Sequence, residues 1–400
     1  MISVDVALER VLAGCKPVAA EMVALPAALG RVLAQDVAAR VAHPPLDVSS
    51  MDGYAVRSAD TRSIPAELTV IGQSAAGHPF DGTVGPGQAV RIFTGAALPA
   101  GADGVIMQEE TEREGDMVRL LETIRPDQFV RPRGLDFMPG QVGLAAGTIM
   151  GPRQIALAAA MNVPWLSVRR RPRVAVLSTG DEIAMPGEPM GPAQLASSNG
   201  PGLAALIAAS GGEPVQLGIA RDSHDSLSTM VAAASGCDLL VTSGGASVGD
   251  YDLVQDVLVA HGMKLDFWKI AMRPGKPLMF GALRNVPVLG LPGNPVAAMM
   301  CAYIFLVPML RALRGLSGGL TVVPAVLAAE LRANDARQDY LRADLRRAAD
   351  GTLRATPLSR QDSAVVSGLA AATGLIIRPP HAPAAKAGET VPAMVFPEGF

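Results

Sequence analysis

The middle of the chain alternates short apolar runs with amphipathic stretches of helical length. Apolar runs typical of buried strands occur at residues 174–177, 214–219, 238–242 and 264–270. Helical patterns separate them, at residues 200–209, 223–234 and 251–260. Strands that alternate with helices in this way predict a mostly parallel sheet with right-handed crossovers. Two more strands, at 277–282 and 286–291, lead into a helix after Asn294, so we expect a three-layer α/β domain over residues 173–315.

The segments on either side of this domain follow other patterns. Residues 3–14 and 26–39 resemble helices, and a helical pattern returns at 152–161, where Pro152 suits the first helical position. The segment 43–141 is rich in Gly and Pro and carries short β-type runs, which also dominate residues 316–400. We therefore expect three further domains: an N-terminal helical and linker domain (1–42 and 142–172), an inserted small β domain (43–141) and a C-terminal β-barrel-like domain (316–400).

The balance of charges narrows the possible partners. Lys and Arg number 34 against 37 Asp and Glu, the net charge is -3, and aromatic residues make up 4% of the chain. Binding of nucleic acid or of an anionic membrane needs a large basic field, and single-strand binding needs aromatic stacking platforms. We therefore expect neither nucleic acid nor a membrane as a partner.

The cysteines and the apolar segments indicate the compartment. Cys15, Cys237 and Cys301 are far apart and form no CxxC pair, which disfavours a zinc ribbon and suits a reducing compartment. The N-terminus lacks the basic region of a signal peptide. The longest apolar stretch, 296–310, is shorter than the ~18–20 residues of a membrane span. We expect a cytoplasmic protein in which this stretch is a buried helix.

The loops at the strand ends carry the candidate chemistry, because ligands of an open parallel sheet bind beyond the carboxyl ends of its strands. After the first strand, Asp181 and Glu182 are adjacent carboxylates that can hold a divalent metal, although a helix cap and a solvated Glu explain this loop somewhat better when it is taken alone. Asp222 opens the helix after the second strand, so N-capping is its first role and metal binding a further one.

The loop after the third strand, TSGGASVGDYD (242–252), is rich in glycine. Backbone N–H groups of such a loop, together with the N-terminus of the next helix, form a cradle for an anion. The loop is not a Walker A loop, because it lacks the GxxxxGK pattern, and it carries no GxGxxG fingerprint. We expect an anionic ligand to contact Ser243, Gly244, Gly245 and Ser247.

The same loop contains GxSxG at 245–249, the pattern of the nucleophile elbow of α/β-hydrolases. Ser247 would then need a downstream histidine as its base. His261 ends the very next helix and His381 lies in a Pro-rich tail. A serine hydrolase therefore stands as an alternative for which the sequence supplies no suitable base.

Two later loops add positive charge and a further helix N-terminus. Lys269, Arg273 and Lys276 cluster around a Pro-Gly turn, where arginine can grip an oxyanion with two hydrogen bonds and lysine acts as a point charge. In the segment LPGNPV (291–296), Asn294 suits a helix N-cap and Pro295 the first helical residue. Carboxylates, N–H cradles and cations on one edge suit a phosphoanhydride and a second oxyanion.

Seven segments in this order resemble the molybdopterin molybdotransferase family, which includes the E domain of gephyrin. The resemblance covers essentially the whole chain. Its segments are SSMDGYAV (49–56), IFTGAALPAGADGVIMQEE (92–110), VRPRGLDF (130–137), STGDEI (178–183), TSGGASVGDYD (242–252), RPGKP (273–277) and LPGNPV (291–296).

The resemblance implies a reaction in which adenylylated molybdopterin and molybdate give molybdenum cofactor and AMP, with a divalent cation, usually Mg²⁺. It implies a homodimer in which the inserted β domain of one chain faces the α/β domain of the other. It also suggests the molybdopterin adenylyltransferase and molybdoenzyme acceptors as partners.

The site residues follow from the resemblance motif by motif. It implies catalytic roles for Asp52, Thr94, Asp136, Glu182, Lys269 and Arg273. It implies a metal site at Glu182, Asp222 and Asp252, and contacts to the pterin nucleotide from Ser243, Gly244, Gly245, Ser247, Lys276, Pro292 and Pro295. Molybdate would be bound by Lys269, Arg273, Arg342 and Ser363.

The chain also departs from the family pattern. Arg273 stands where many members carry Lys, Ala297 where Ser is common, and Leu135 where Glu is frequent, so we expect the details of the molybdate pocket to differ. An adenylyltransferase of the same α/β fold is the nearest alternative, and the two β domains argue against it. A cofactor carrier or scaffold is the alternative of another class, and the lack of a long disordered linker argues against it.

Overall fold

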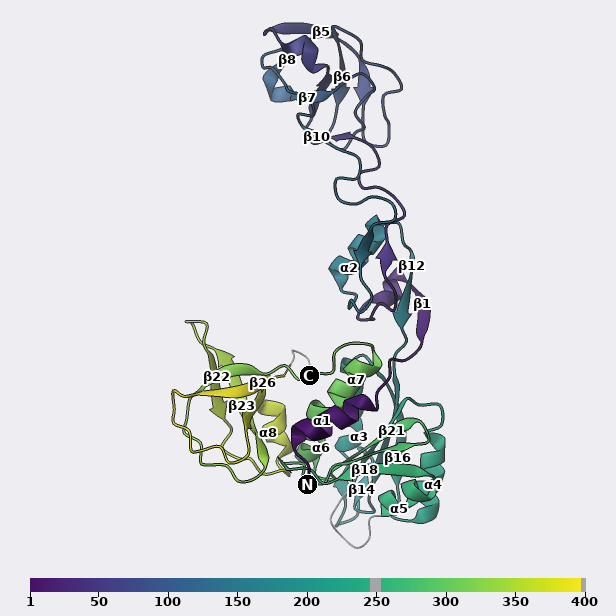
Figure 1. Ribbon diagram of the computed structural model, residues 1–400, viewed down its shortest axis with the longest axis vertical. Coiled ribbons are helices and arrows are strands. Elements are labelled where there is room, and N and C mark those ends of the chain that lie inside the picture. Colours follow the sequence, from purple (N-terminus) through teal and green to yellow (C-terminus); the bar gives the residue numbers. More distant parts are fainter. Residues whose placement is uncertain (245–252, 397–400) are drawn as a thin grey trace. The chain divides into compact units, whose positions relative to one another are not determined.

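The computed structural model describes residues 1–244 and 253–396 and separates into two compact units (Figure 1). The first unit comprises Met1–Glu21 and Arg169–Phe400, and the second comprises Met22–Val168. Each unit has its own apolar cores.

A six-stranded mixed sheet forms the centre of the first unit. Its order is β16 (Glu213–Ala220), β13 (Arg173–Thr179), β17 (Leu239–Ser243), β21 (Val286–Leu291), β20 (Met279–Leu283) and β18 (Met263–Trp268). The first four strands are parallel, and β20 runs antiparallel to both β21 and β18. Because of this double reversal, β18 is parallel to β21. The carboxyl ends of β13, β17, β21 and β18 therefore lie at one edge of the sheet.

Helices cover both faces of this sheet, which confirms the predicted three-layer α/β domain. Val174 and Val176 of β13 pack on one side, and Ala175 and Leu177 pack on the other, as the two-residue period of a strand requires. One face is covered by α3 (Asn199–Ala209), α6 (Pro295–Cys301), the π-helical η4 (Ala302–Leu306) and α7 (Val307–Leu313). The other face is covered by α4 (His224–Ala233) and α5 (Leu253–Ala260).

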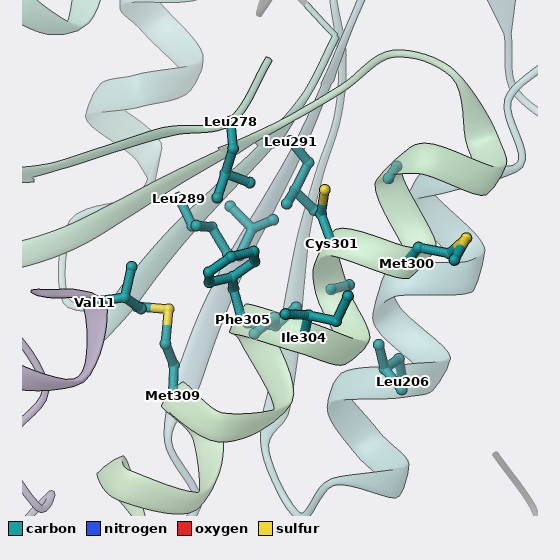
Figure 2. Packing of buried hydrophobic residues seen from close by; sticks show 14 of the residues in the cluster. Val11, Leu206, Leu278, Leu289, Leu291, Met300, Cys301, Ile304, Phe305 and Met309 are labelled. Atoms are coloured by element: carbon teal, nitrogen blue, oxygen red, sulfur yellow. The ribbon is translucent and has the colours of Figure 1, made fainter. Parts of the chain in front are cut away.

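The continuous helix Pro295–Leu313 is the apolar centre of the first core. It has 19 residues with a mean hydropathy of 2.0, long and apolar enough to cross a membrane, and 72% of its most apolar window is buried inside the protein. Figure 2 shows Phe305 and Met309 of this helix against Leu289 and Val11. Burial of a side chain as large as Phe305 contributes about 2–3 kcal/mol, so this segment packs as the predicted core helix.

The first helix, α1 (Val4–Ala13), belongs to this same core. Val4, Ala7 and Val11 lie on one helical face and pack into the cluster around Phe305. The side chain of Ser3 caps the helix by accepting a hydrogen bond of 3.3 Å from the Val6 N–H. The sequence placed residues 1–42 in one N-terminal domain, whereas the structure puts α1 with the α/β domain because its apolar face completes that core.

The C-terminal part of the first unit is a closed five-stranded barrel, as predicted. Its strands are β22 (Val323–Leu327), β23 (Gln338–Arg347), β24 (Leu353–Pro357), β25 (Gly374–Arg378) and β26 (Thr390–Val395), and the pairing of β23 with β25 closes it. The helix α8 (Val366–Ala371) lies in the connection between β24 and β25. A short strand of the α/β domain, β19 (Met272–Arg273), pairs in parallel with the start of β23 and so joins the barrel to the sheet edge.

The second unit holds the inserted β domain and the linker domain. The β domain is built on a six-stranded sheet, in the order β7 (Gly104–Met107), β4 (Gly53–Val56), β6 (Gln88–Ile92), β5 (Ala66–Ser74), β9 (Met117–Leu120) and β8 (Thr111–Glu114). The linker core gathers η1 (Leu25–Ala28), β2 (Val37–Ala38), β11 (Val142–Leu144) and α2 (Pro152–Ala160). The helix predicted at 26–39 is wrong: η1 is one 3-10 turn, and Val37 enters a strand instead.

Several short elements complete the two units. In the second unit β3 (Val48–Ser49) pairs with β10 (Val130–Arg131), and β1 (Ala20–Ala24) pairs with β12 (Trp165–Arg169). Two 3-10 turns, η2 (Ser58–Thr61) and η3 (Gln108–Glu110), lie in the β domain. In the first unit β14 (Ile183–Ala184) pairs with β15 (Leu195–Ala196) just after the end of β13.

Candidate active site at the carboxyl edge of the sheet

The register of the parallel strands brings their end loops together. Ser178 of β13 lies opposite Ser243 of β17, and Ser243 lies opposite Leu291 of β21. A cavity of about 640 Å³ opens at this edge. Its walls come from the segments 178–183, 195–199, 243–244, 272–277 and 292–297, with Arg337 and Ser363 added from the barrel. We call it the edge cavity.

Glu182 supplies the carboxylate of the edge cavity. The backbone of Gly180 has φ of 137°, and a Cβ there would lie 2.3 Å from Glu182 Oε2, so only glycine lets this carboxylate fold back over the end of the strand. Within the described residues, the Glu182 carboxylate has no hydrogen bond or ion pair, and it is exposed to the cavity. An unpaired carboxylate of this kind is free to hold a cation.

Ser243 and Gly244 form the floor of the edge cavity, but their polar groups already have partners. Asn199 Nδ2 donates to Ser243 Oγ at 2.7 Å and to the Gly293 carbonyl at 2.8 Å. The Gly244 N–H donates to the Leu291 carbonyl at 3.3 Å. These bonds tie three strand-end loops to each other, so this part of the predicted anion cradle serves to hold the loops together.

Gly244 itself fits only as glycine. Its φ is +96°, and a Cβ there would lie 2.5 Å from the carbonyl oxygen of Thr179 and 2.7 Å from its Oγ1. The close approach of β13 and β17 at this point therefore requires a residue without a side chain. The close approach of the two strands therefore explains why residue 244 is glycine, whether or not the loop also binds a ligand.

Three cations line the edge cavity: Arg273, Lys276 and Arg337. Arg273 donates to Asp335 Oδ2 and to Asn334 Oδ1, each at 3.2 Å, and also to Asp339. Arg337 forms a fork with Asp335, in which Nη2 lies 2.8 Å from Oδ2. Among the described residues Lys276 makes no ion pair, and its side chain is exposed.

Ser363 reaches the edge cavity from the loop between β24 and α8. Asn294 Nδ2 donates to Ser363 Oγ at 2.9 Å, and the Val296 N–H donates to the Ser363 carbonyl at 3.3 Å. Asn294 thus precedes α6 as predicted, with Pro295 in the first turn, but its side chain makes no capping bond and binds Ser363 instead.

Arg342 does not line the edge cavity. Its side chain is buried, and the guanidinium donates to the carbonyls of Val365 at 2.8 Å, Arg360 at 3.0 Å and Asp362 at 2.9 Å. All three carbonyls belong to the loop that carries Ser363. In the structure, the residue that the resemblance assigns to molybdate holds this loop in place.

Other predicted residues also lie away from the edge cavity. The Nζ of Lys269 stands 4.0 Å from the centre of the Trp268 ring, and Lys269 is absent from the cavity wall. Asp222 follows β16, one strand further out, is exposed, and does not line the cavity. Gly245, Ser247 and Asp252 lie outside the described residues. Pro292 and Pro295 line the cavity.

The predicted residues of the second unit divide between two places. Thr94 donates to Asp52 Oδ1 from both its N–H and its Oγ1, each at 2.7 Å, and these bonds lower the pKa of the Asp52 carboxyl. Asp136 lies on a separate cavity of about 690 Å³, whose polar lining includes His43 and Arg131. Both places are exposed to solvent, so the second unit presents carboxylates on its surface.

Family models match successive parts of the chain. The MoeA N-terminal region (domain I and II) matches residues 2–162, a probable molybdopterin binding domain matches residues 175–312, and the MoeA C-terminal region (domain IV) matches residues 324–396. Together these matches cover the second unit, the α/β domain and the barrel.

Named relatives agree with these matches. The chain is 41% identical over 331 residues to the molybdopterin molybdenumtransferase of Nostoc sp., covering 80% of this chain and 76% of that protein. It is 37% identical over 318 residues to the molybdopterin molybdenumtransferase of Haemophilus influenzae, with coverage of 79% and 78%. Two solved structures of the molybdopterin biosynthesis MoeA protein from Pyrococcus horikoshii give TM-scores of 0.88 and 0.84 at 32% and 27% identity, each covering 99% of this chain and 99% and 100% of theirs.

These similarities define the class as multidomain α/β proteins of molybdenum cofactor biosynthesis. The chain belongs to the MoeA family, whose relatives of established name are molybdopterin molybdenumtransferases. These relatives do not favour the alternative functions of an adenylyltransferase, a cofactor carrier or a serine hydrolase.

The sequence pattern does not indicate Asn199 and Arg337 as residues of the edge cavity. Asn199 ties the Ser243 and Gly293 loops together, yet its local pattern is only that of a helix start. Arg337 lies just before β23 and enters the cavity because β23 pairs with β19. A pairing between strands more than sixty residues apart leaves no local signal, so the sequence pattern could not place Arg337.

Proposed function

We propose that this protein inserts molybdate into adenylylated molybdopterin at the edge cavity and releases AMP. The main observation behind this proposal is that one cavity at the carboxyl edge of the sheet is lined by three cations and one carboxylate. The cations are Arg273, Lys276 and Arg337, and the carboxylate is that of Glu182. A substrate with a phosphoanhydride and an oxyanion co-substrate needs cations that face both. The named relatives support the choice of molybdate as that oxyanion.

The residues of the chain divide the work by their chemistry. Lys276 offers an exposed point charge, and the guanidinium groups of Arg273 and Arg337 offer paired donors for oxyanions. Ser363 Oγ adds a hydroxyl from the loop between β24 and α8. In this proposal a molybdate oxygen attacks the AMP-side phosphorus, and the P–O bond to the phosphate on the pterin side breaks. The two dithiolene sulfurs then bind molybdenum as the Mo–O bond to AMP breaks, so that AMP leaves with the former molybdate oxygen and takes up the protons released by the two thiols.

The proposed magnesium ion fits one side of the edge cavity. Mg²⁺ is commonly held by one or two carboxylates together with substrate phosphates and water, and Glu182 is a carboxylate without a partner among the described residues. Asp222 is on the neighbouring strand end, outside the cavity wall. No three metal-binding side chains cluster within residues 1–244 and 253–396, so substrate oxygens would complete the shell. The ion would neutralise the charge of the phosphoanhydride.

We also propose that the working form is a cytoplasmic homodimer. Asp52, Thr94 and Asp136 lie on the second unit. In the proposed dimer the inserted β domain of one chain would face the α/β domain of the other, as the family resemblance suggests. The exposed Asp52 carboxylate, kept charged by Thr94, would then face the substrate bound to the partner chain. The adenylyltransferase and molybdoenzymes are the proposed partners upstream and downstream.

The test is AMP release from adenylylated molybdopterin while molybdate is titrated. In Glu182→Ala we expect kcat to fall about 100-fold, the loss usual for a group that stabilises transferring charge. Glu213→Ala is the matched control, because Glu213 is an exposed carboxylate at the amino end of β16, far along the strand from the cavity edge. Wild-type protein that releases AMP at a rate independent of molybdate would refute the proposal.

A further inference from the structure

A single carboxylate from the barrel faces two of the three cations of the edge cavity. Asp335 Oδ2 lies 2.8 Å from Arg337 Nη2 and 3.2 Å from Arg273 Nη1. Asp335 Oδ1 also accepts from the Arg337 N–H at 2.8 Å and from Nε at 3.4 Å. Asp335 thus forms a bidentate pair with one guanidinium and a bridge to the other.

The three carboxylates described near these cations differ in how easily an incoming anion could displace them. Asp339, which also pairs with Arg273, has a side chain only 5% exposed and is fixed in β23. The Asp335 side chain is 46% exposed and lies in the loop before β23. Glu182 lines the cavity, and within the described residues it makes no ion pair with any of the three cations. Asp335 is therefore the partner that an incoming anion can displace.

The charges of this cluster balance while Asp335 is in place. Arg273 and Arg337 carry two positive charges, which Asp335 and Asp339 neutralise, and among the described residues Lys276 alone lines the cavity as an unpaired cation. Two arginines that line the edge cavity are thus held by internal anions. An oxyanion that binds there must compete with these anions.

We propose that Asp335 is an internal counter-ion that sets the affinity of the edge cavity for oxyanions by competing with them for the guanidinium groups of Arg273 and Arg337. The inference rests on the proposed function for the identity of the oxyanion, but not for the competition itself. Binding of the oxyanion turns the two guanidinium groups from Asp335 to the ligand. Departure of the ligand restores the internal pairs, which helps the anionic product to leave.

Asp335 remains a competitor at every physiological pH. The hydrogen bonds from Arg337 lower the pKa of the Asp335 carboxyl to about 2, with a further contribution from Arg273. The carboxylate is therefore charged throughout pH 5–8. Removal of its charge changes oxyanion affinity without adding a pH dependence of its own in that range.

The experiment measures oxyanion binding to the full-length protein by isothermal titration calorimetry, with molybdate and inorganic phosphate as separate probes. Asp335→Asn keeps an oxygen for the Arg337 N–H but removes the charge, and we expect its Kd for molybdate to fall about tenfold. Arg337→Gln removes the guanidinium, and we expect the Kd to rise about tenfold. Asp350→Asn is the control, because Asp350 accepts from Thr352 in a similar turn but lies in the β23–β24 connection.

The outcomes separate the inference from the proposed function. Weaker or unchanged molybdate binding in Asp335→Asn, with normal binding in Asp350→Asn, overturns the counter-ion role. Unchanged binding in Arg337→Gln shows that Asp335 and the oxyanion do not compete for this guanidinium, and a wild-type protein that binds neither probe likewise overturns the counter-ion role. A third outcome supports the counter-ion role and refutes the proposed function. In that outcome the Kd for phosphate falls in Asp335→Asn and rises in Arg337→Gln, molybdate does not bind, and the rate of AMP release does not depend on molybdate.

Discussion

At the scale of the residue, the thiols show how the fold restrains reactive groups. Burial raises the pKa of the Cys15 thiol to about 12, and it also raises the pKa of Cys237 and of Cys301. Cys237 and Cys301 are buried, and the Cys15 thiol donates to the Val11 carbonyl. A thiol is nucleophilic only as the thiolate, so these three side chains act as small apolar groups.

We expect these cysteines to resist alkylation in the folded protein. At pH 8 a pKa of about 12 leaves almost no thiolate at Cys15, and Cys237 and Cys301 are buried away from the reagent, whereas an unfolded cysteine with a pKa near ~8.5 reacts readily. Iodoacetamide at pH 8 should label the native protein at least about 100-fold more slowly than the protein in guanidinium. Mass spectrometry of timed samples measures both rates, and rapid native labelling at Cys301 would contradict its burial.

The residue scale also shows where prediction from sequence stops. The sequence identified Asn294, Arg342 and Ser363 as polar residues of interest, and the structure brings Asn294 and Ser363 to one wall of the edge cavity. The sequence did not indicate that Asn294 binds Ser363, nor that Arg342 is buried against three carbonyls. Residue type is a local property, but the choice of hydrogen-bond partner depends on which distant segment lies alongside.

At the scale of the element, the loop between β24 and α8 depends on Arg342. Besides the three carbonyls that accept from its guanidinium, the Arg342 N–H donates to Gln361 Oε1 at 3.0 Å, and Gln361 Nε2 returns a bond of 2.9 Å to the Arg342 carbonyl. These bonds fix the loop on both sides of Ser363. Arg342 therefore acts on the edge cavity through the position of Ser363.

Replacement of this guanidinium should cost stability. In Arg342→Lys the ammonium cannot reach all three carbonyls, so we expect the free energy of unfolding in urea to fall by about 2–4 kcal/mol. Arg354→Lys, on the exposed side of β24, should change it by less than about 0.5 kcal/mol. Unchanged stability together with a large loss of molybdate affinity would show instead that Arg342 binds the ligand directly.

At the scale of the whole molecule, the candidate residues divide between two units. Glu182 and the three cations belong to the first unit, whereas Asp52 and Thr94 belong to the second. In the proposed homodimer, the second unit of one chain would lie against the edge cavity of its partner, which would bring the two groups of residues together. Such a site is shared between the two chains, and this arrangement can be tested by mixing inactive chains.

We expect two inactive variants to restore each other. A heterodimer of an Asp52→Asn chain and a Glu182→Ala chain would contain one doubly damaged site and one intact site, so its rate of AMP release should reach about half that of the wild type. Two different affinity tags and tandem purification isolate the heterodimer, and each homodimer serves as the control. An isolated heterodimer as inactive as the homodimers would show that both residues serve a site within one chain.

The sequence by itself determined the layered α/β domain, the β-rich insertion, the terminal barrel and the family. The alternation of strands with helices is a periodic signal in the local sequence, and glycines such as Gly244 mark the turns between these elements. The sequence placed α1 wrongly, because an amphipathic helix reveals that it must pack but not against which core.

The tertiary structure alone decided which distant residues share the edge cavity. The pairing of β19 with β23 and the closure of the barrel bring Arg337, Asp335 and Ser363 to loops that lie more than fifty residues away in the sequence. It also decided that two of the cavity cations are paired with carboxylates of the barrel. The physical reason is that strand register and long-range ion pairs are fixed by the packing of whole elements, which no local pattern of residues records.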